Sequence, residues 1–108
     1  MALKHVSPCE VANLRTFGTQ GSEEAANALT KNDAFEAIVM RLPPGKTLPP
    51  HAVDGPLIVQ CLSGEVDFSV EGASRILRAG DWMHLPGGAS HAVEAHEESR
   101  ILVTILFR

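Results

Sequence analysis

Two stretches of this sequence decide its fold: Gly45-Lys-Thr-Leu-Pro-Pro-His51-Ala-Val-Asp-Gly-Pro-Leu57-Ile-Val-Gln-Cys-Leu-Ser-Gly64 and Gly80-Asp-Trp-Met-His84-Leu-Pro86-Gly-Gly88-Ala-Ser-His91. Each stretch carries a turn glycine, then proline, then a histidine, and lies against an apolar segment. Glycine and proline mark the turns between short strands. The pair therefore predicts a small β-barrel in which His51 and His91 face each other across the hollow.

Short strands separated by turn signals run through the rest of the chain. Residues 65–70 alternate polar and apolar side chains, which places Val66, Phe68 and Val70 on one face of a strand. Residues 101–107 are too apolar to face water on either side and predict a central strand or a subunit contact. Further strands are expected at 26–30, 35–42, 57–62, 75–78, 82–85 and 91–95. About eight short strands without a long helix indicate an all-β sandwich or barrel.

The length of 108 residues allows one domain. We divide it into an N-terminal arm, residues 1–24, and a barrel, residues 25–108. Within the arm, residues 11–17 predict either a strand or a segment that lies on another subunit. Ser22, followed by Glu23 and Glu24, is typical of a helix start. A strand through residues 26–30 is favoured, because it would pair with the segment that follows.

Charge and composition exclude several classes of function. The net charge is −4 and the lysines and arginines are not clustered, so we expect neither nucleic acid nor an anionic membrane as a partner. No run approaches the ~20 apolar residues of a membrane helix. The first residues do not resemble a signal peptide, so we expect a cytoplasmic protein. Sheet edges and the apolar last strand need covering, which favours a homodimer.

The two cysteines predict packing rather than chemistry. Cys61 lies inside an apolar run and is expected to be a small buried hydrophobe. Cys9 lies in the arm, and a disulfide between the two is disfavoured in a reducing compartment. A nucleophilic Cys61 would need a neighbouring base and a lowered pKa, and no feature of the sequence indicates either.

Taken together, the two glycine-proline-histidine stretches resemble the two sequence motifs of the cupin superfamily. Gly45, His51 and Gly64 stand where the first motif has its glycines and a histidine. The positions that match the second motif, with every spacing kept, are Gly80, Asp81, Pro86, Gly88 and His91. The resemblance implies a double-stranded β-helix, a conical jelly-roll barrel, in a family whose members are mostly dimers or bicupins.

Metal-binding cupins take His-x-His and a glutamate from the first motif and one histidine from the second. Here Val53 and Leu57 stand at the positions of the second histidine and the glutamate, so His51 and His91 remain. Two protein ligands are one short of the three usual in an open catalytic zinc site. His84 would be a third ligand if it points inward on its strand, and a surface or interface residue if it points outward.

Three functions remain open for the pocket. In the first, the two histidines orient one polar group of a small organic ligand in an apolar pocket. The residues expected to form that pocket are His51, Val53, Leu57, Val59, Cys61 and His91. In the second, a divalent Fe, Zn, Mn or Ni ion is held by histidines in a dioxygenase- or isomerase-like enzyme. The residues expected to hold that ion are His51, His91 and His84. In the third, a non-catalytic dimer senses a metabolite. We favour the first, because aliphatic side chains replace two donors.

Overall fold

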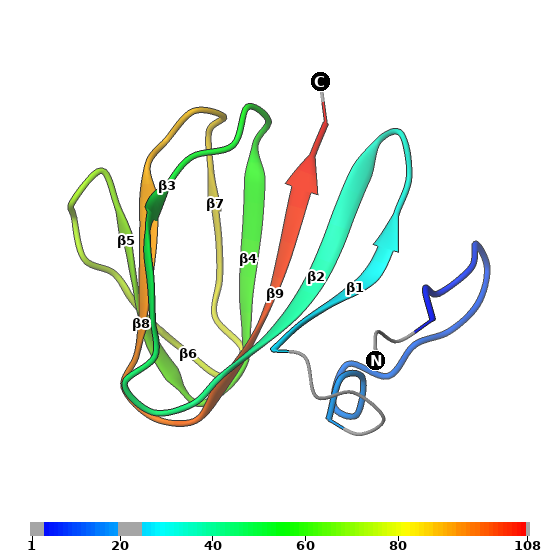
Figure 1. The fold of residues 1–108 in the computed structure, drawn as a ribbon, viewed down its shortest axis with the longest axis horizontal. Helices are drawn as coiled ribbons and strands as arrows, with labels where there is room; N and C mark the ends of the chain where they lie inside the picture. The colour runs from blue at the N-terminus through cyan, green and yellow to red at the C-terminus, as the bar shows by residue number, and fades with distance from the viewer. Residues whose placement is uncertain (1–3, 20–24, 108) are drawn as a thin grey trace.

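The computed structural model describes residues 4–19 and 25–107, and this part of the chain contains nine β-strands in two antiparallel sheets (Figure 1). The five-stranded sheet has the order β1 (Ala26–Lys31), β2 (Phe35–Leu42), β9 (Ser99–Leu106), β4 (Leu57–Ser63) and β7 (Trp82–Leu85). The four-stranded sheet has the order β3 (Thr47–His51), β8 (His91–Ala95), β5 (Glu65–Val70) and β6 (Ile76–Arg78). The predicted all-β class is confirmed. No helix within the described ranges is long and apolar enough to cross a membrane.

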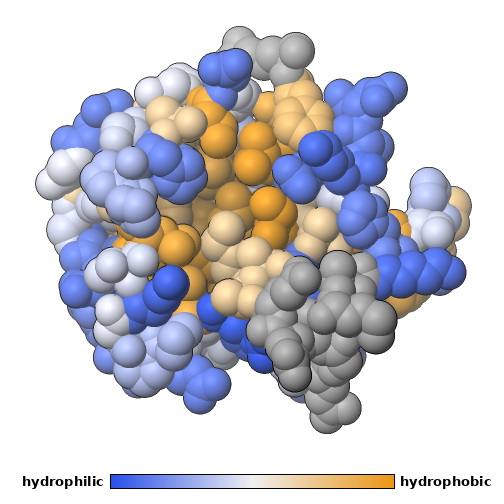
Figure 2. All heavy atoms as spheres, in the orientation of Figure 1, coloured by the Kyte–Doolittle hydropathy of each residue, from blue (hydrophilic) through white to orange (hydrophobic). Residues whose placement is uncertain are grey.

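The core lies between the two sheets. Val66 and Phe68 of β5 are almost completely buried, as the alternation of that strand predicts, and Val70 is partly buried at the edge of the same core. Residues two apart on a strand point to the same side, so Val59 and Ile101 enter this core from β4 and β9. Figure 2 looks into the space between the sheets, where apolar side chains lie inside a rim of polar ones.

Strand β9 is the centre of the five-stranded sheet, between β2 and β4. Its inner face contributes Ile101 and Val103 to the core, and Leu102 on its outer face is also buried. The prediction that this segment is a central strand is therefore confirmed. A strand buried on both faces reads as a continuous apolar run, as this one does.

The N-terminal arm lies on the outer face of the same chain's larger sheet. Leu14 and Phe17 pack there against a small cluster, which is formed by Ala37, Val39 and Leu102. The predicted strand over residues 11–17 is wrong, because residues 14–19 form turns and the Phe17 amide donates to the carbonyl of Asn13. The helix start considered at residues 22–24 lies outside the described residues.

Strand β3 contains two prolines and still pairs with β8. It is an edge strand of the four-stranded sheet, and an edge position tolerates proline because one side of the strand needs no ladder partner. The register shifts between Leu48 and His51, where Pro49 and Pro50 lack amide hydrogens. Proline keeps this segment extended, and the structure shows it as a paired strand.

Gly64, which closes the β4–β5 turn, allows a sharp test of the backbone. Its φ is +81°, and a Cβ atom there would clash with the Ser99 hydroxyl and the Glu98 carbonyl and lie 2.7 Å from the Ser99 Cα. Gly72 has a similar φ of +80° with open space around it. We predict that Gly72→Ala lowers the free energy of unfolding by about 1 kcal/mol, and that Gly64→Ala lowers it by more than about 2 kcal/mol. Urea denaturation measures both, and equal losses would contradict the close approach at Gly64.

An exposed ion pair links the start of β5 to the turn after β8. His96 Nδ1 donates to Glu65 Oε2 at 2.9 Å, and Arg78 Nε lies 3.1 Å from Glu65 Oε1. The hydrogen bond with Glu65 raises the pKa of His96, and the same bond lowers the pKa of Glu65. The pair therefore stabilises the fold when Glu65 is ionised and His96 is protonated.

We predict a small destabilisation by His96→Ala that depends on pH. The difference in stability between the wild type and His96→Ala is largest when the pH lies between the ordinary pKa values of 4.5 for Glu65 and 6.5 for His96. It disappears as the pH rises through the raised pKa of His96, and as the pH falls through the lowered pKa of Glu65. Thermal unfolding of both proteins across the acidic and mildly alkaline range measures the difference. A difference that does not change with pH would contradict the ion pair.

Candidate functional site

Neighbouring strands β3 and β8 bring the two predicted histidines together. His51 ends β3 and His91 begins β8, and the two are direct partners in the antiparallel register. Their ring centroids are 4.3 Å apart and their planes are inclined by 59°. The rings therefore meet, but the expectation that they face each other from opposite walls is wrong, since both strands belong to one sheet.

Backbone carbonyls determine which nitrogen of each ring carries hydrogen. His91 Nδ1 lies 3.2 Å from the carbonyl oxygen of Ala89, and His51 Nδ1 lies 3.3 Å from that of Pro49. A carbonyl oxygen only accepts hydrogen bonds, so Nδ1 is the protonated nitrogen in both rings. In the neutral form, Nε2 of each ring is then a hydrogen-bond acceptor with an available lone pair.

The two histidines differ in their surroundings. His91 is only 4 % exposed and stacks on Phe68, with ring centroids 5.6 Å apart and planes inclined by 8°. Burial lowers the pKa of His91, the nearby His51 lowers it further, and the hydrogen bond to Ala89 opposes both effects. His51 is exposed at the mouth of the site. The buried ring is therefore a neutral imidazole at neutral pH.

The histidines border an apolar cavity of about 150 Å³ between the sheets. The other residues that line it are Ile38, Met40, Leu48, Leu57, Phe68, Val93, Ile101, Val103 and Ile105. Pockets for drug-sized ligands measure roughly 300–1,000 Å³, so this cavity suits a much smaller molecule. Apart from the imidazoles, every lining side chain is a hydrocarbon or a thioether.

Of the pocket residues predicted on β4 and just before it, only Leu57 lines the cavity. Val59 and Cys61 point into the barrel but are 0 % and 1 % exposed, because close-packed side chains separate them from the cavity. Val53 is partly buried beside the core and is also absent from the lining. The structure therefore does not place these three residues on the wall of this cavity, which lies towards β2 and β9.

The residues that sequence reasoning missed come mainly from β2 and β9. Met40 and Ile101 are partners in the register of these strands, and so are Ile38 and Val103. Their side chains line one wall of the cavity. Alternation in β2 could have grouped Ile38 with Met40, but the arm also buries the opposite face, and the pattern does not say which face is the inner one.

His84 lies away from the other two histidines. Its neighbours on β7, Met83 and Leu85, face the core, so His84 projects outward and is exposed beside Trp82, with ring centroids 5.3 Å apart. Throughout residues 4–19 and 25–107, no group of three or more His, Cys, Asp or Glu side chains is arranged to hold a metal ion. The donors present, two imidazole Nε2 atoms, do not fit the three-ligand set that a catalytic metal requires.

These observations define a class of protein, a small two-sheet barrel whose apolar cavity is bordered by a pair of histidines. Residues 38–107 match the family model described as the cupin domain, and the chain therefore belongs to the cupin superfamily. It is similar to the oxalate-binding protein of Thermotoga maritima, with 33 % identity over 94 residues, which cover 82 % of this chain and 76 % of the relative.

Solved structures agree with this assignment. A cupin superfamily protein from Desulfitobacterium hafniense matches with a TM-score of 0.82 at 16 % identity, over 100 % of both chains. A predicted oxalate decarboxylase from Thermotoga maritima matches with a TM-score of 0.70 at 27 % identity, over 77 % of this chain and 79 % of that chain. The predicted cupin barrel is confirmed.

Cys61 is a packed thiol. Burial and the nearby Asp81 raise its pKa, and its Sγ lies 3.4 Å from the Ser63 carbonyl oxygen, to which the thiol donates. A raised pKa keeps the thiol protonated and unreactive. Both cysteines are free, and Cys9 is exposed.

We predict that a disulfide reagent such as Ellman's reagent modifies one thiol per folded chain quickly, because only Cys9 is accessible. The Cys9→Ser variant should show no fast reaction, and urea should expose Cys61 in both proteins. Absorbance at the thiolate product's maximum follows the reaction. Two fast thiols in the folded wild type would contradict the burial of Cys61.

Proposed function

We propose that this cupin binds a small organic molecule that has one compact oxygen-bearing head group, a carboxyl or hydroxyl group, and a short apolar body. The observation that supports it most is the pair of Nε2 acceptors of His51 and His91 at the border of an otherwise apolar cavity. A ligand with this division of polarity matches both parts of the site.

The head group is inferred from the hydrogen-bonding needs of the histidines. His91 is almost completely buried, and its Nε2 is an acceptor because Nδ1 carries the hydrogen. A ligand that fills the cavity has to give this nitrogen a donor, since leaving it unpaired would cost about 1–3 kcal/mol, and an O–H group of the ligand is such a donor. A carboxyl group bound here shares one hydrogen between its oxygen and Nε2, while Nδ1 stays bonded to the Ala89 carbonyl.

The body of the ligand is inferred from the lining of the cavity. Side chains such as Leu57, Met40 and Val103 offer no hydrogen bonds, so a second polar group placed among them would lose its hydration without compensation. Burying apolar ligand surface contributes roughly 25 cal/mol per Å² instead. The cavity therefore favours a few carbon atoms behind the head group.

The relative that is named an oxalate-binding protein supports a small carboxylic acid as the ligand class. Oxalate is two carboxylates joined directly, without an apolar part, and the hydrocarbon lining here fits it poorly. We therefore place the ligand among monocarboxylic acids or alcohols with a short carbon chain. The expected homodimer and cytoplasmic location stay predictions.

We predict that isobutyrate binds the wild-type protein together with one proton and that His91→Ala weakens binding by about tenfold or more, because this variant removes the acceptor of the single O–H of the head group. His51→Ala, which removes a ring from the exposed border of the site, should weaken binding less. His84→Ala is the matched control, a histidine lost from the outer face, and should bind as the wild type does. Oxalate should bind more weakly than isobutyrate. Chemical-shift titration of the cavity methyl groups measures the affinity of each of the four proteins for isobutyrate, and that of the wild type for oxalate.

Elemental analysis of protein purified without chelator separates this proposal from a metal-dependent enzyme. Stoichiometric Fe, Zn, Mn or Ni in the wild type, lost in both His51→Ala and His91→Ala, would contradict the metal-free ligand site. Equal isobutyrate affinity in the wild type and His91→Ala would contradict the role of the buried imidazole.

A further inference from the structure

The residues that line the histidine cavity fall into two groups that differ in exposure. One group is buried and forms the inner wall: Leu57, Phe68, His91, Val93, Ile101 and Val103. The other group is partly or fully exposed and forms the border: Ile38, Met40, Leu48, His51 and Ile105. The cavity therefore opens to solvent on the side of the border.

The opening lies between strands β2 and β3. Ile38 and Met40 of the border come from β2, and Leu48 and His51 come from β3. β3 is an edge of the four-stranded sheet and β2 belongs to the other sheet, and the strands of the described residues include no pairing between the two. Figure 1 shows them on either side of the hollow, and Figure 2 shows apolar side chains exposed between the sheets. A ligand therefore reaches His91 by passing between these strands.

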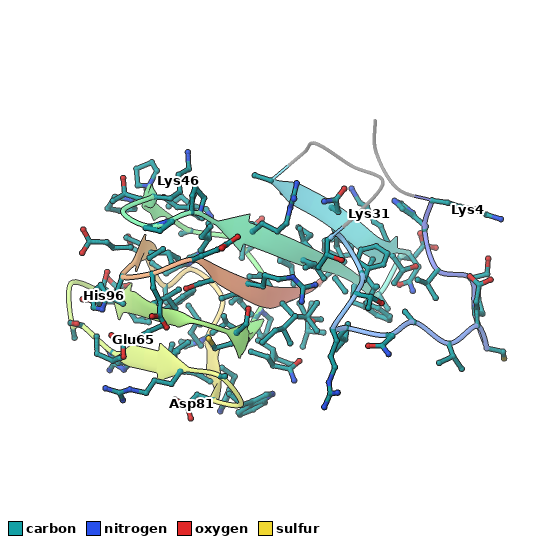
Figure 3. All side chains as sticks on the ribbon, turned by 90° about the horizontal axis from the view of Figure 1, so that it is seen from below. Lys4, Lys31, Lys46, Glu65, Asp81 and His96 are labelled. Atoms are coloured by element: carbon teal, nitrogen blue, oxygen red, sulfur yellow. The ribbon has the colours of Figure 1, made fainter. Side chains whose placement is uncertain are left out.

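No charged side chain of the described residues lines this cavity or its border. Charged residues such as Lys46 and Asp81 are exposed at the periphery of the barrel (Figure 3). Every lining side chain is an imidazole, a hydrocarbon or a thioether. Two ligands that share a head group are therefore distinguished by how their apolar bodies fit the space behind it.

Met40 is the border side chain best suited to set the size of that space. It lies opposite Ile101 of the inner wall in the register of β2 and β9, and it is itself partly exposed. Its unbranched thioether fills irregular gaps, whereas the neighbouring Ile38 and Ile105 are β-branched and stiff. A body larger than the cavity competes with the thioether for the same space. Shortening Met40 would release that space and leave the inner wall intact.

The inner wall offers a bulky ligand no room. Phe68 and Ile101 are almost completely buried in the main core cluster, together with Val59 and Val66 behind the cavity. A close-packed core resists added volume, because it forces side chains out of their preferred rotamers. Extra bulk therefore has to be accommodated at the border.

We infer that Met40 determines the bulk of the ligand that the histidine cavity accepts, so that the protein selects monocarboxylic acids or alcohols with a small body against bulkier ones with the same head group. This inference rests on the proposed function, since it takes the position of the head group at His91 as given. It adds the residue that makes the selection and the part of the ligand that is selected.

Two acids with one head group and different bodies test the inference. Isobutyrate and cyclohexanecarboxylate present the same carboxyl group to His91, so the ratio of their affinities cancels the contribution of the head group. Met40→Ala removes as many heavy atoms as cyclohexanecarboxylate has beyond those of isobutyrate. We expect the wild type to bind cyclohexanecarboxylate about tenfold or more weakly than isobutyrate, and Met40→Ala to shift this ratio by about tenfold towards cyclohexanecarboxylate. Chemical-shift titration of the cavity methyl groups measures both affinities.

Two further variants make the test specific. Met83→Ala is the matched control, because Met83 packs against the same core cluster but does not line the cavity. It loses the same atoms, and its affinity ratio should stay within about twofold of the wild-type ratio. Met40→Leu keeps a side chain of similar volume and should retain the preference for isobutyrate. Because Met40→Ala predicts a gain for the bulky acid, misfolding of this variant cannot imitate the expected result.

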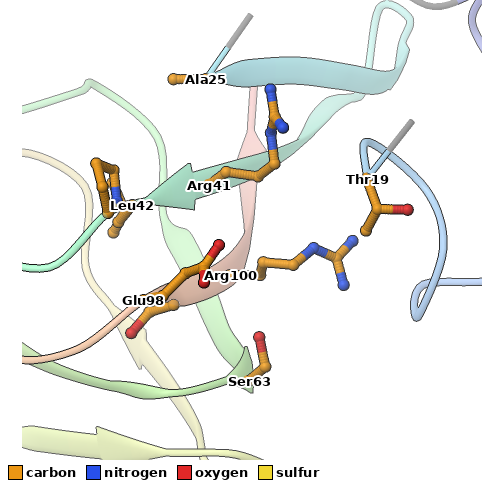
Figure 4. Close-up of a pocket in the computed structure, with 9 residues that line it drawn as sticks. Thr19, Ala25, Arg41, Leu42, Ser63, Glu98 and Arg100 are labelled. Atoms are coloured by element: carbon orange, nitrogen blue, oxygen red, sulfur yellow. The ribbon is translucent and has the colours of Figure 1, made fainter. Parts of the chain in front are cut away.

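A second cavity, of about 510 Å³, provides a check on where the acids bind. It lies at the end of β2 and the beginning of β9, and its lining includes Arg41, Glu98 and Arg100 (Figure 4). Both Nη atoms of Arg100 already donate to backbone carbonyls of the arm, those of Arg15 and Phe17, so a carboxylate would have to compete with these bonds. We expect no saturable shift of the Arg41 and Arg100 amides in either titration.

The possible failures separate this inference from the proposed function. A wild type that binds neither acid in the histidine cavity, or binds them with saturable shifts centred on Arg41 and Arg100, would overturn the proposed function and the inference with it. A wild type that binds isobutyrate, together with equal affinity ratios in Met40→Ala and Met83→Ala, would overturn the inference alone. Equal affinity of the wild type for both acids would do the same.

Discussion

The pairing of β3 with β8 is the constraint on which the site depends. It sets His51 directly beside His91, so that the two ring centroids lie 4.3 Å apart. A slip of one residue would move His51 to the other face of the sheet. The carbonyls of Pro49 and Ala89, each two residues before its histidine, then fix both tautomers. Local backbone geometry thus prepares two acceptors before a ligand arrives.

Strands β2 and β9 lie between the cavity and the N-terminal arm, and side chains pack against both of their faces. Their inner residues, such as Met40 and Ile101, line the cavity, and their outer residues, such as Val39 and Leu102, hold the N-terminal arm. The arginines at their ends lie on the same outer face as the arm.

Much of the fold could be predicted from the sequence, because glycines, prolines and alternation mark turns and strands locally. The meeting of His51 and His91 was also predictable, since each belongs to one of the two stretches that resemble the cupin motifs. Their origin in adjacent strands was not, because strand order is a long-range property. That Ile38 and Met40 line the cavity could not be predicted, for a different reason. Both faces of β2 are covered, and an apolar run does not show which side faces the interior.

The nitrogen resonances of the two imidazole rings test the central claim most directly. We predict that in the free protein at neutral pH His91 is neutral, with Nδ1 protonated and Nε2 unprotonated, and that the neutral form of His51 has the same tautomer. Long-range proton–nitrogen correlation spectra of ¹⁵N-labelled protein distinguish the two tautomers. A His91 ring protonated at Nε2 would contradict this prediction. The lone pair of Nδ1 would then face the lone pairs of the Ala89 carbonyl oxygen, and Nε2 could no longer accept a hydrogen bond from a ligand.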